Sequence, residues 1–308
     1  MQIVLAENFR AVFYAPFYAC LELGFFRAQG LEVALKASPS PGAGIADMLS
    51  GSTHLVWGGP MRVLKDRDTH PHDHRSLIAF GEVAARDPFH LLGHASLQPF
   101  ALHTLGRLKL AAVSETVTPW LCLQQDLRDL GMDPDTIERA TDASMEDNLK
   151  ALAAGHVDVV QAFEPYVSLA EREGLAVPLY AAHLRGPTAY TTFLSTGENL
   201  ERHDAPFRAM AQALSGFPAW LDAEGTASLA RLVGSYYPHV EPGILEQSLA
   251  RCRQSALWTC RPEVSREGFA RLAQSLLSGR YIDHAASYET CVAAWAQEAR
   301  LPTAIPPA

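Results

Sequence analysis

The sequence has few lysines and little positive charge. Only four lysines occur in 308 residues, and 25 basic against 34 acidic side chains leave a net charge of −9. Because nucleic acids and anionic membrane surfaces attract proteins through lysine and arginine, this balance argues against either as the main partner. The chain also lacks a run of about 18 apolar residues, so no membrane insertion is expected.

Cysteine is scarce as well. The five cysteines are odd in number and form no CxxC pair, so neither a disulfide framework nor a zinc motif is indicated, and we expect no cofactor. The stretch HPHDH sets three histidines on alternate positions of a loop. Solvated side chains are the default interpretation of such a tract, and a metal site is the alternative. The three are His70, His72 and His74.

The first ten residues, MQIVLAENFR, do not have the pattern of a signal peptide. They lack a basic leader and an apolar core of about 7–15 residues. If Met1 is the natural start, the protein is cytoplasmic. If a leader has been removed, it is periplasmic, and the sequence leaves both locations open.

The first half of the chain alternates short apolar runs with helical patterns. QIVLA (2–6) is bounded by polar residues, which is typical of a buried strand. Pro16 suits the first turn of the helix that follows, and Gly30 suits its end. LEVAL (31–35) is then the next strand. This βαβ succession predicts a parallel sheet covered by helices.

The same alternation continues along the chain. Further strands are predicted at 54–59, 76–83, 108–113 and 157–163, and further helices at 44–50, 61–67, 118–131 and 145–154. LSGSTHLVWGGP (49–60) and AAGHVDVVQAFEP (153–165) share one form, from a helix end through a glycine to an apolar strand. Such an echo predicts two lobes of similar construction. After residue 195 the sequence predicts helices, at 204–222, 225–236, 242–254, 264–278 and 285–299.

These segments resemble the NMT1/THI5-like branch of the type II substrate-binding proteins. The resemblance rests on PFYACLELGFFRAQGLEVAL, the strand after Gly51, ALAAGHVDVVQAFEP and SYETCVAAWAQEA, and it covers nearly the whole chain in order. It implies an α/β, two-lobe fold of the type II periplasmic-binding-protein kind, with mixed sheets flanked by helices and a helical C-terminal part. One lobe would hold 1–84 and 188–300 and the other 92–184, with hinge crossings near 85–91 and 185–188.

The resemblance also implies a ligand clamp. A small molecule would lie between the lobes at the C-terminal ends of the strands, where open α/β sheets place their sites. We expect a neutral or weakly basic, pyrimidine-like heterocycle, because Glu115 would oppose an anion. The protein would be the monomeric solute-binding component of an ABC-type importer, with the permease as partner. The alternatives are a cytosolic ligand sensor and an enzyme of thiamine-pyrimidine metabolism.

The candidate ligand-binding residues follow the expected strand ends. Trp57, beside two glycines, either stacks on a ligand ring or belongs to the core. Thr118 either binds the ligand or caps a helix, and an acid at a strand end either binds an amino-pyrimidine edge or pairs with an arginine. The full set is Asn8, Arg10, Phe13, Tyr14, Ser38, Trp57, Gly58, Gly59, Glu82, Glu115, Thr116, Thr118, Trp120, Glu164 and Tyr190.

The residues at two positions argue against the enzyme chemistry known in the family. Its pyrimidine synthases need a lysine for a Schiff base just after the strand that here ends at Trp57, and a histidine four residues later. Those positions hold Gly58 and Arg62, and the family's cysteine-rich motif is absent. A Schiff base cannot form without an amine. Lys36 is the one lysine that we expect near the cleft, so the sequence favours a binding protein.

Overall fold

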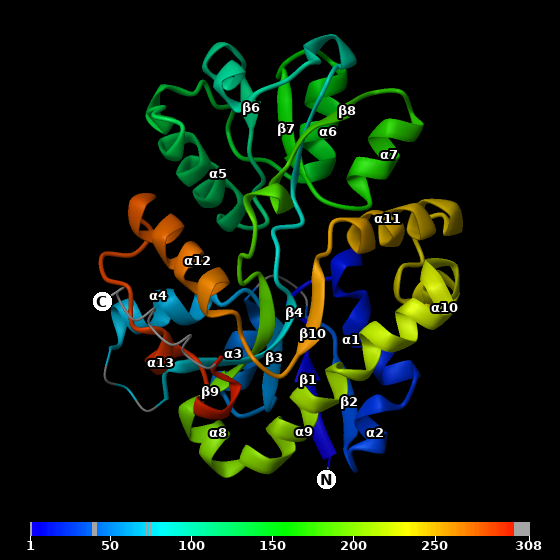
Figure 1. Cartoon of the computed structure of the whole chain (residues 1–308), viewed down its shortest axis with the longest axis vertical. Helices are drawn as coiled ribbons and strands as arrows, with labels where there is room; N and C mark the ends of the chain where they lie inside the picture. The colour runs from blue at the N-terminus through cyan, green and yellow to red at the C-terminus, as the bar shows by residue number, and fades with distance from the viewer. Residues whose placement is uncertain (1, 39–41, 72, 74, 299–308) are drawn as a thin grey trace, which may run out of the picture.

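Two mixed β-sheets, each flanked by helices, form the frame of the molecule (Figure 1). The structure is a computed structural model, and it describes residues 2–38, 42–71, 73 and 75–298. The first sheet has the order β10-β4-β9-β3-β1-β2, and the second has the order β6-β7-β5-β8. The strands are β1 (Gln2–Ala6), β2 (Glu32–Lys36), β3 (Leu55–Gly58), β4 (Leu77–Ala84), β5 (His90–Gly93), β6 (Leu110–Ala111), β7 (Val159–Ala162), β8 (Val177–Ala181), β9 (Thr191–Thr196) and β10 (Trp258–Arg261).

The predicted βαβ start of the chain is confirmed. β1 pairs in parallel with both β2 and β3, and Pro16 lies in the first turn of the helix between β1 and β2. The helices are α1 (Ala15–Glu22), α2 (Phe25–Ala28), α3 (Ala43–Leu49), α4 (Met61–Thr69), α5 (Thr118–Asp129), α6 (Met145–Ala153), α7 (Tyr166–Arg172), α8 (Gly197–Arg202), α9 (Asp204–Leu214), α10 (Gly216–Val233), α11 (Pro242–Gln254), α12 (Arg266–Ser278) and α13 (Tyr288–Cys291).

The sequence echo corresponds to equivalent strands of the two sheets. β3 lies between a parallel neighbour, β1, and an antiparallel one, β9. β7 likewise lies between parallel β6 and antiparallel β5. Gly51 and Gly155 precede these strands with φ of +82° and +69°, a backbone conformation that favours glycine. The two halves therefore share a helix–glycine–strand unit in the same place.

The C-terminal part differs from the helical prediction in three places. One strand, β10, pairs antiparallel with β4 at the edge of the first sheet, and its four residues are too short for a clear pattern. The helix predicted over 204–222 is instead two helices, α9 and α10, that meet at Ser215, whereas the break inside α10 at Gly225, whose φ is +77°, lies where the predicted helix 225–236 begins. The helix expected over 285–299 is only α13 followed by a short turn, because Val292 instead bridges to Ala79 along the sheet.

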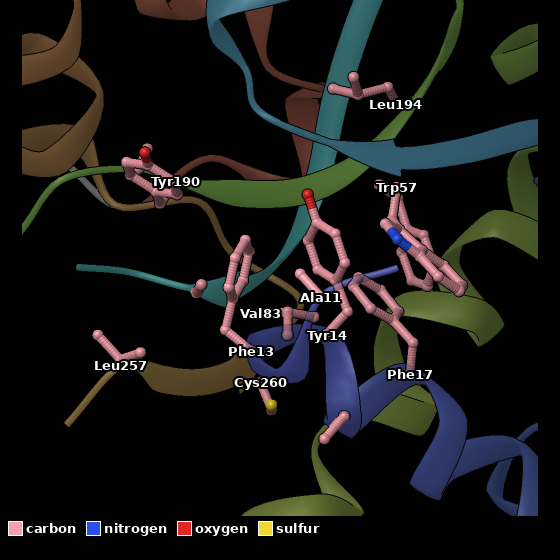
Figure 2. Close-up of a cluster of buried hydrophobic side chains, with 14 of the residues drawn as sticks. Ala11, Phe13, Tyr14, Phe17, Trp57, Val83, Tyr190, Leu194, Leu257 and Cys260 are labelled. Carbon is pink, nitrogen blue, oxygen red and sulfur yellow. The ribbon is translucent and has the colours of Figure 1, made fainter. Parts of the chain in front are cut away.

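The core of the first sheet is built from aromatic rings (Figure 2). Trp57, near the end of β3, is fully buried, and its ring stacks on Phe17 with centroids 4.5 Å apart and an interplanar angle of 8°. Tyr14 and Tyr18 approach the same indole at 5.8 and 5.4 Å. Of the two interpretations of Trp57, a stacking residue in the ligand site or a core residue, the structure therefore supports the core residue.

The chain crosses from the first sheet to the second between β4 and β5 and returns between β8 and β9. Buried charges tie the two crossings together. Arg185 on the return forms ion pairs with Asp87 on the outward crossing and with Asp126 on α5, and Asp87 is fully buried. Arg271 on α12 donates to the backbone carbonyls of Arg185 and Pro187 at 2.6 and 2.8 Å. The crossings are thus fixed to each other and to helices on both sides.

One buried histidine predicts a dependence of stability on pH. Burial is the main reason why the pKa of His90 falls from 6.5 to about 3, and the nearby positive charge of Arg251 acts in the same direction. A depressed folded-state pKa adds stability above pH 6.5 that is lost as the pH falls toward 3. We expect His90→Leu to flatten the fall in unfolding free energy over this range, measured by urea denaturation. Equal slopes for the two proteins would contradict the prediction.

Candidate ligand-binding site

A cavity of about 460 Å³ lies between segments of the two sheets. The loop after β1 contributes Asn8, Phe9, Phe13 and Tyr14, the loop after β3 contributes Gly59, Met61 and Arg62, and the loop after β6 contributes residues 114–118. The remaining lining residues are Phe89, Ala189, Tyr190, Leu272 and Tyr281. Three strand ends from two sheets therefore meet at one cavity, which is where open α/β sheets bind ligands.

Aromatic rings from the loop after β1 form one wall. A short turn, Val12–Tyr14, is closed by the Tyr14 N–H donating to the Ala11 carbonyl at 3.0 Å. This turn brings the rings of Phe13 and Tyr14 to a centroid distance of 4.3 Å, and Phe9 lies 5.4 Å from Tyr14. Burial raises the pKa of Tyr14 to about 12, so its phenol stays protonated at neutral pH. The wall can offer apolar ring faces and a hydroxyl.

Arg62 is the only basic side chain among the cavity-lining residues. It lies in the first turn of α4, and its Nη2 donates to Asn8 Oδ1 at 3.3 Å. Within the described part of the chain, no carboxylate lies within ion-pair distance of this guanidinium. Arg62 thus retains donors for an acceptor group on a ligand.

The opposite wall is the loop between β6 and α5. Thr116 and Thr118 bring their hydroxyl oxygens within 3.4 Å of each other at the start of α5. Glu115 turns toward a second helix, where its Oε1 accepts the backbone N–H of Met145 at 3.0 Å, in the first turn of α6. Its Oε2 is buried and has no partner in the structure as described. This oxygen lacks the donor that a buried carboxylate normally has.

A second unpartnered polar atom lies at the same cavity. Tyr190, just before β9, is 8% exposed, and its hydroxyl is buried with no hydrogen-bond partner among the described residues. Burial raises the pKa of Tyr190 well above its ordinary value, so the phenol is neutral. Buried polar atoms without partners are rare in native proteins. Together, Tyr190 and Glu115 mark the cavity as a place where polar groups of a ligand can be received.

The structure brings part of the predicted set to this cavity. Those lining it are Asn8, Phe13, Tyr14, Gly59, Glu115, Thr116, Thr118 and Tyr190. Sequence reasoning did not name Phe9, Met61, Phe89, Leu272 or Tyr281 as site residues. Arg62 enters the sequence analysis only as the residue that stands where the family's pyrimidine synthases have a histidine. Because that histidine belongs to their active site, the position itself could have suggested that Arg62 lies in the site here. Leu272 and Tyr281 come from the C-terminal part, where no sequence pattern indicates a position at the cavity.

Two predicted acids lie in ion pairs away from the cavity. Glu82 is fully buried in β4 and pairs with Arg261 at 3.1 Å. Glu164, after β7, pairs with Arg251 at 2.6 Å. The alternative interpretation of these acids is an ion pair with an arginine, for which Arg86, near Glu82 in the sequence, is a candidate. Arg86 instead donates to the backbone carbonyl of His183.

The remaining candidates also lie outside the cavity lining. Arg10 pairs with Glu7 at 2.6 Å, and the Ser38 hydroxyl accepts the Gly44 N–H at the start of α3. The others are Trp57 in the core, Gly58 in β3 and Trp120 beneath the guanidinium of Arg139.

The histidine tract is only partly described. His70 lies 3.4 Å from the carboxylate of Asp66, whereas His72 and His74 lie outside the described residues. Within those residues, no three histidine, cysteine, aspartate or glutamate side chains are arranged to hold a metal ion. No described helix combines the length and apolar character of a membrane span.

Solved structures with the same architecture define the fold class. The periplasmic aliphatic sulphonate binding protein SsuA of Escherichia coli superposes with a TM-score of 0.75 at 15% identity, over 94% of this chain and 96% of that one. The ligand binding component of an ABC-type import system from Staphylococcus aureus gives 0.67 at 13% identity, over 95% and 96%. The fold is therefore the two-lobe, type II periplasmic-binding-protein fold, with two mixed sheets.

The chain belongs to the NMT1/THI5-like family, whose model matches residues 12–216. A relative with a curated description, "Putative binding protein YtlA" of Bacillus subtilis, is 20% identical over 263 residues, which are 85% of this chain and 78% of that protein. The resemblance drawn from the sequence is thereby confirmed at the level of the family.

Proposed function

We propose that the protein is a solute-binding protein that captures a small molecule between its two sheets and delivers it to the permease of an ABC-type importer. The observation that carries this proposal is the cavity of about 460 Å³ at the strand ends of both sheets. Its volume falls in the range of about 300–1,000 Å³ that is usual for small-molecule sites. The relative named a binding protein and the neighbour from an ABC-type import system support the same function.

We further propose that the two lobes close around the ligand. The lobes are residues 1–84 with 188–300, and 92–184, and the crossings near 85–91 and 185–188 act as the hinge. Closure about such a hinge is a common response of two-lobe proteins to a ligand. It would press the Arg62 side of the cavity toward the loop 114–118.

The ligand that best suits this cavity is a flat, pyrimidine-like heterocycle, of which a thiamine precursor is one example. Phe9 and Phe13 offer ring faces, and each stacked ring contributes about 0.5–1.5 kcal/mol beyond area burial. A donor on the ligand would satisfy the free oxygen of Glu115, and an acceptor would meet Arg62. Hydrogen bonds to charged groups contribute about 1.5–3 kcal/mol each.

The proposed function is tested by native mass spectrometry of gently purified protein. We expect a small molecule to remain bound and to be released on unfolding, and its mass to identify it. Calorimetry with the released molecule should then show at least about tenfold weaker binding to Arg62→Ala, since about 1.4 kcal/mol corresponds to one decade. Arg202→Ala, which removes an exposed arginine on α8, is the matched control. Unchanged affinity of Arg62→Ala would reject this cavity as the site.

The alternative of pyridoxal-phosphate chemistry gives a separate prediction. Gly58 has no side-chain amine that could form a Schiff base. Lys36 is paired with Asp47 at 2.8 Å and does not line the cavity. We expect no internal aldimine absorbance with added pyridoxal phosphate and no pyrimidine product. Trapping with borohydride followed by peptide mapping checks this. A reduced adduct on Lys36 would instead support the hypothesis that the protein is an enzyme.

A further inference from the structure

A second cavity of about 420 Å³ lies beside the first and is also lined from both sheets. Phe9 and Glu115 line both cavities and form the partition between them. Phe163, which lines the second cavity, stacks on Phe9 with ring centroids 6.2 Å apart. Tyr166, in the first turn of α7, adds further aromatic surface, whereas the ring of Tyr236 stacks on Tyr18 with centroids 4.2 Å apart. The second cavity is thus an open, aromatic-lined pocket with a carboxylate at its edge.

The charged side chains that line this cavity differ in how fully they are paired. Arg10 is the one arginine that lines it, and its guanidinium is held by Glu7, to which Nη2 donates at 2.6 Å and Nε at 3.3 Å. The same guanidinium donates to the Tyr236 carbonyl at 3.1 Å. The charge of Arg10 is therefore matched by a carboxylate that is itself 4% exposed.

The negative charge of Glu115 is not matched by an opposite charge in the same way. Glu115 accepts one backbone N–H at the start of α6, which offsets the positive end of that helix. Its second oxygen has no partner among the described residues. Burial, followed by the negative charges of Glu115 and Glu146, raises the pKa of Tyr166. The phenol of Tyr166 is therefore neutral beside this cavity.

We propose that the second cavity binds a small organic cation of the alkylammonium class, held between aromatic faces and Glu115. A cation within about 6 Å of a ring centroid is attracted by the negative face of the ring, and the attraction increases when water is excluded. Phe163 and Tyr166 come from one lobe, and Phe9 comes from the other. A bound cation would touch both lobes. Glu115 borders both cavities, so the cation and the molecule in the first cavity would compete for the same carboxylate oxygen.

Choline is a suitable probe, and dimethylbutanol is its uncharged counterpart, in which carbon replaces the charged nitrogen. We expect calorimetry to show millimolar or tighter binding of choline and at least about tenfold weaker binding of dimethylbutanol. Glu115→Gln keeps an oxygen that can accept the Met145 N–H but loses the charge. This variant should lose about tenfold in choline affinity. Glu224→Gln, which removes an exposed carboxylate on α10, should bind choline as the wild type does.

Variants of Tyr166 separate the second cavity from the first, because Tyr166 lines only the second. We expect Tyr166→Phe to retain choline binding and Tyr166→Ala to weaken it severalfold, while both bind the molecule released from the first cavity as the wild type does. Tyr166 is half-buried, so the fold should tolerate either change. Absence of choline binding, equal binding of dimethylbutanol, or full affinity in Tyr166→Ala would each overturn the proposal, whatever the first cavity binds.

Discussion

Replacing Trp57 by alanine is expected to lower the free energy of unfolding by about 3–5 kcal/mol, the usual loss when a buried Trp or Phe is truncated. The indole is fully buried, stacks on Phe17 and is approached by Tyr14 and Tyr18. Truncation removes these contacts and leaves a cavity at the centre of the first sheet. Urea denaturation followed by circular dichroism measures the loss.

Trp57→Phe is the informative control. It keeps an aromatic ring against Phe17 and removes an indole N–H that is buried with no hydrogen-bond partner in the described structure. Since an unpartnered buried donor is itself costly, the phenylalanine variant should lose much less stability than the alanine variant. A fully stable Trp57→Ala with weakened ligand binding would instead place Trp57 in the ligand site.

Replacing Arg185 by methionine should cost a similar amount, about 3–5 kcal/mol, because it leaves buried carboxylates without their counter-ion. Arg185 is 6% exposed on its side chain, and its partners Asp87 and Asp126 are 0% and 12% exposed. Burial already raises the pKa of Asp87, and Arg185 opposes that rise. The loss should therefore be greatest at neutral pH and smaller in acid, where the carboxylates take up protons.

The matched control is Arg202→Met. Arg202 pairs with Glu198 one helical turn away, and both side chains are largely exposed at 61% and 44%. Exposed pairs of this kind contribute about 0–1 kcal/mol, so little change in stability is expected. Equal effects for the two arginines would show that the ion pairs of Arg185 with Asp87 and Asp126 are not a buried network.

Much of the fold could be predicted from the sequence because local signals were strong. The strands around Val4 and Val33, and the glycine-ended helices between strands, follow patterns set by burial and by backbone conformation. β10 was missed because its pairing partner, β4, lies far away in the sequence. The boundary between α9 and α10 was missed although Gly216 and Pro218 stand beside it, whereas the break at Gly225 falls where a further helix was predicted to begin.

The cavity was harder to predict than the fold. The sequence indicated which loops follow strand ends, and Asn8, Phe13 and Glu115 were found in this way. It did not indicate which way a side chain points, so Trp57 and Glu164 were named although one packs in the core and the other pairs with Arg251. Tyr281 reaches the cavity from the far end of the chain, which only the three-dimensional packing determines.

The position of the bound ligand decides whether the protein holds its ligand between the two sheets. A crystal structure of the protein with the molecule that mass spectrometry identifies should show it in the first cavity. We predict that the ligand contacts Arg62 on one side and the loop 114–118 on the other. A ligand bound elsewhere, or one that touches only one of these two walls, would contradict a clamp between the two sheets.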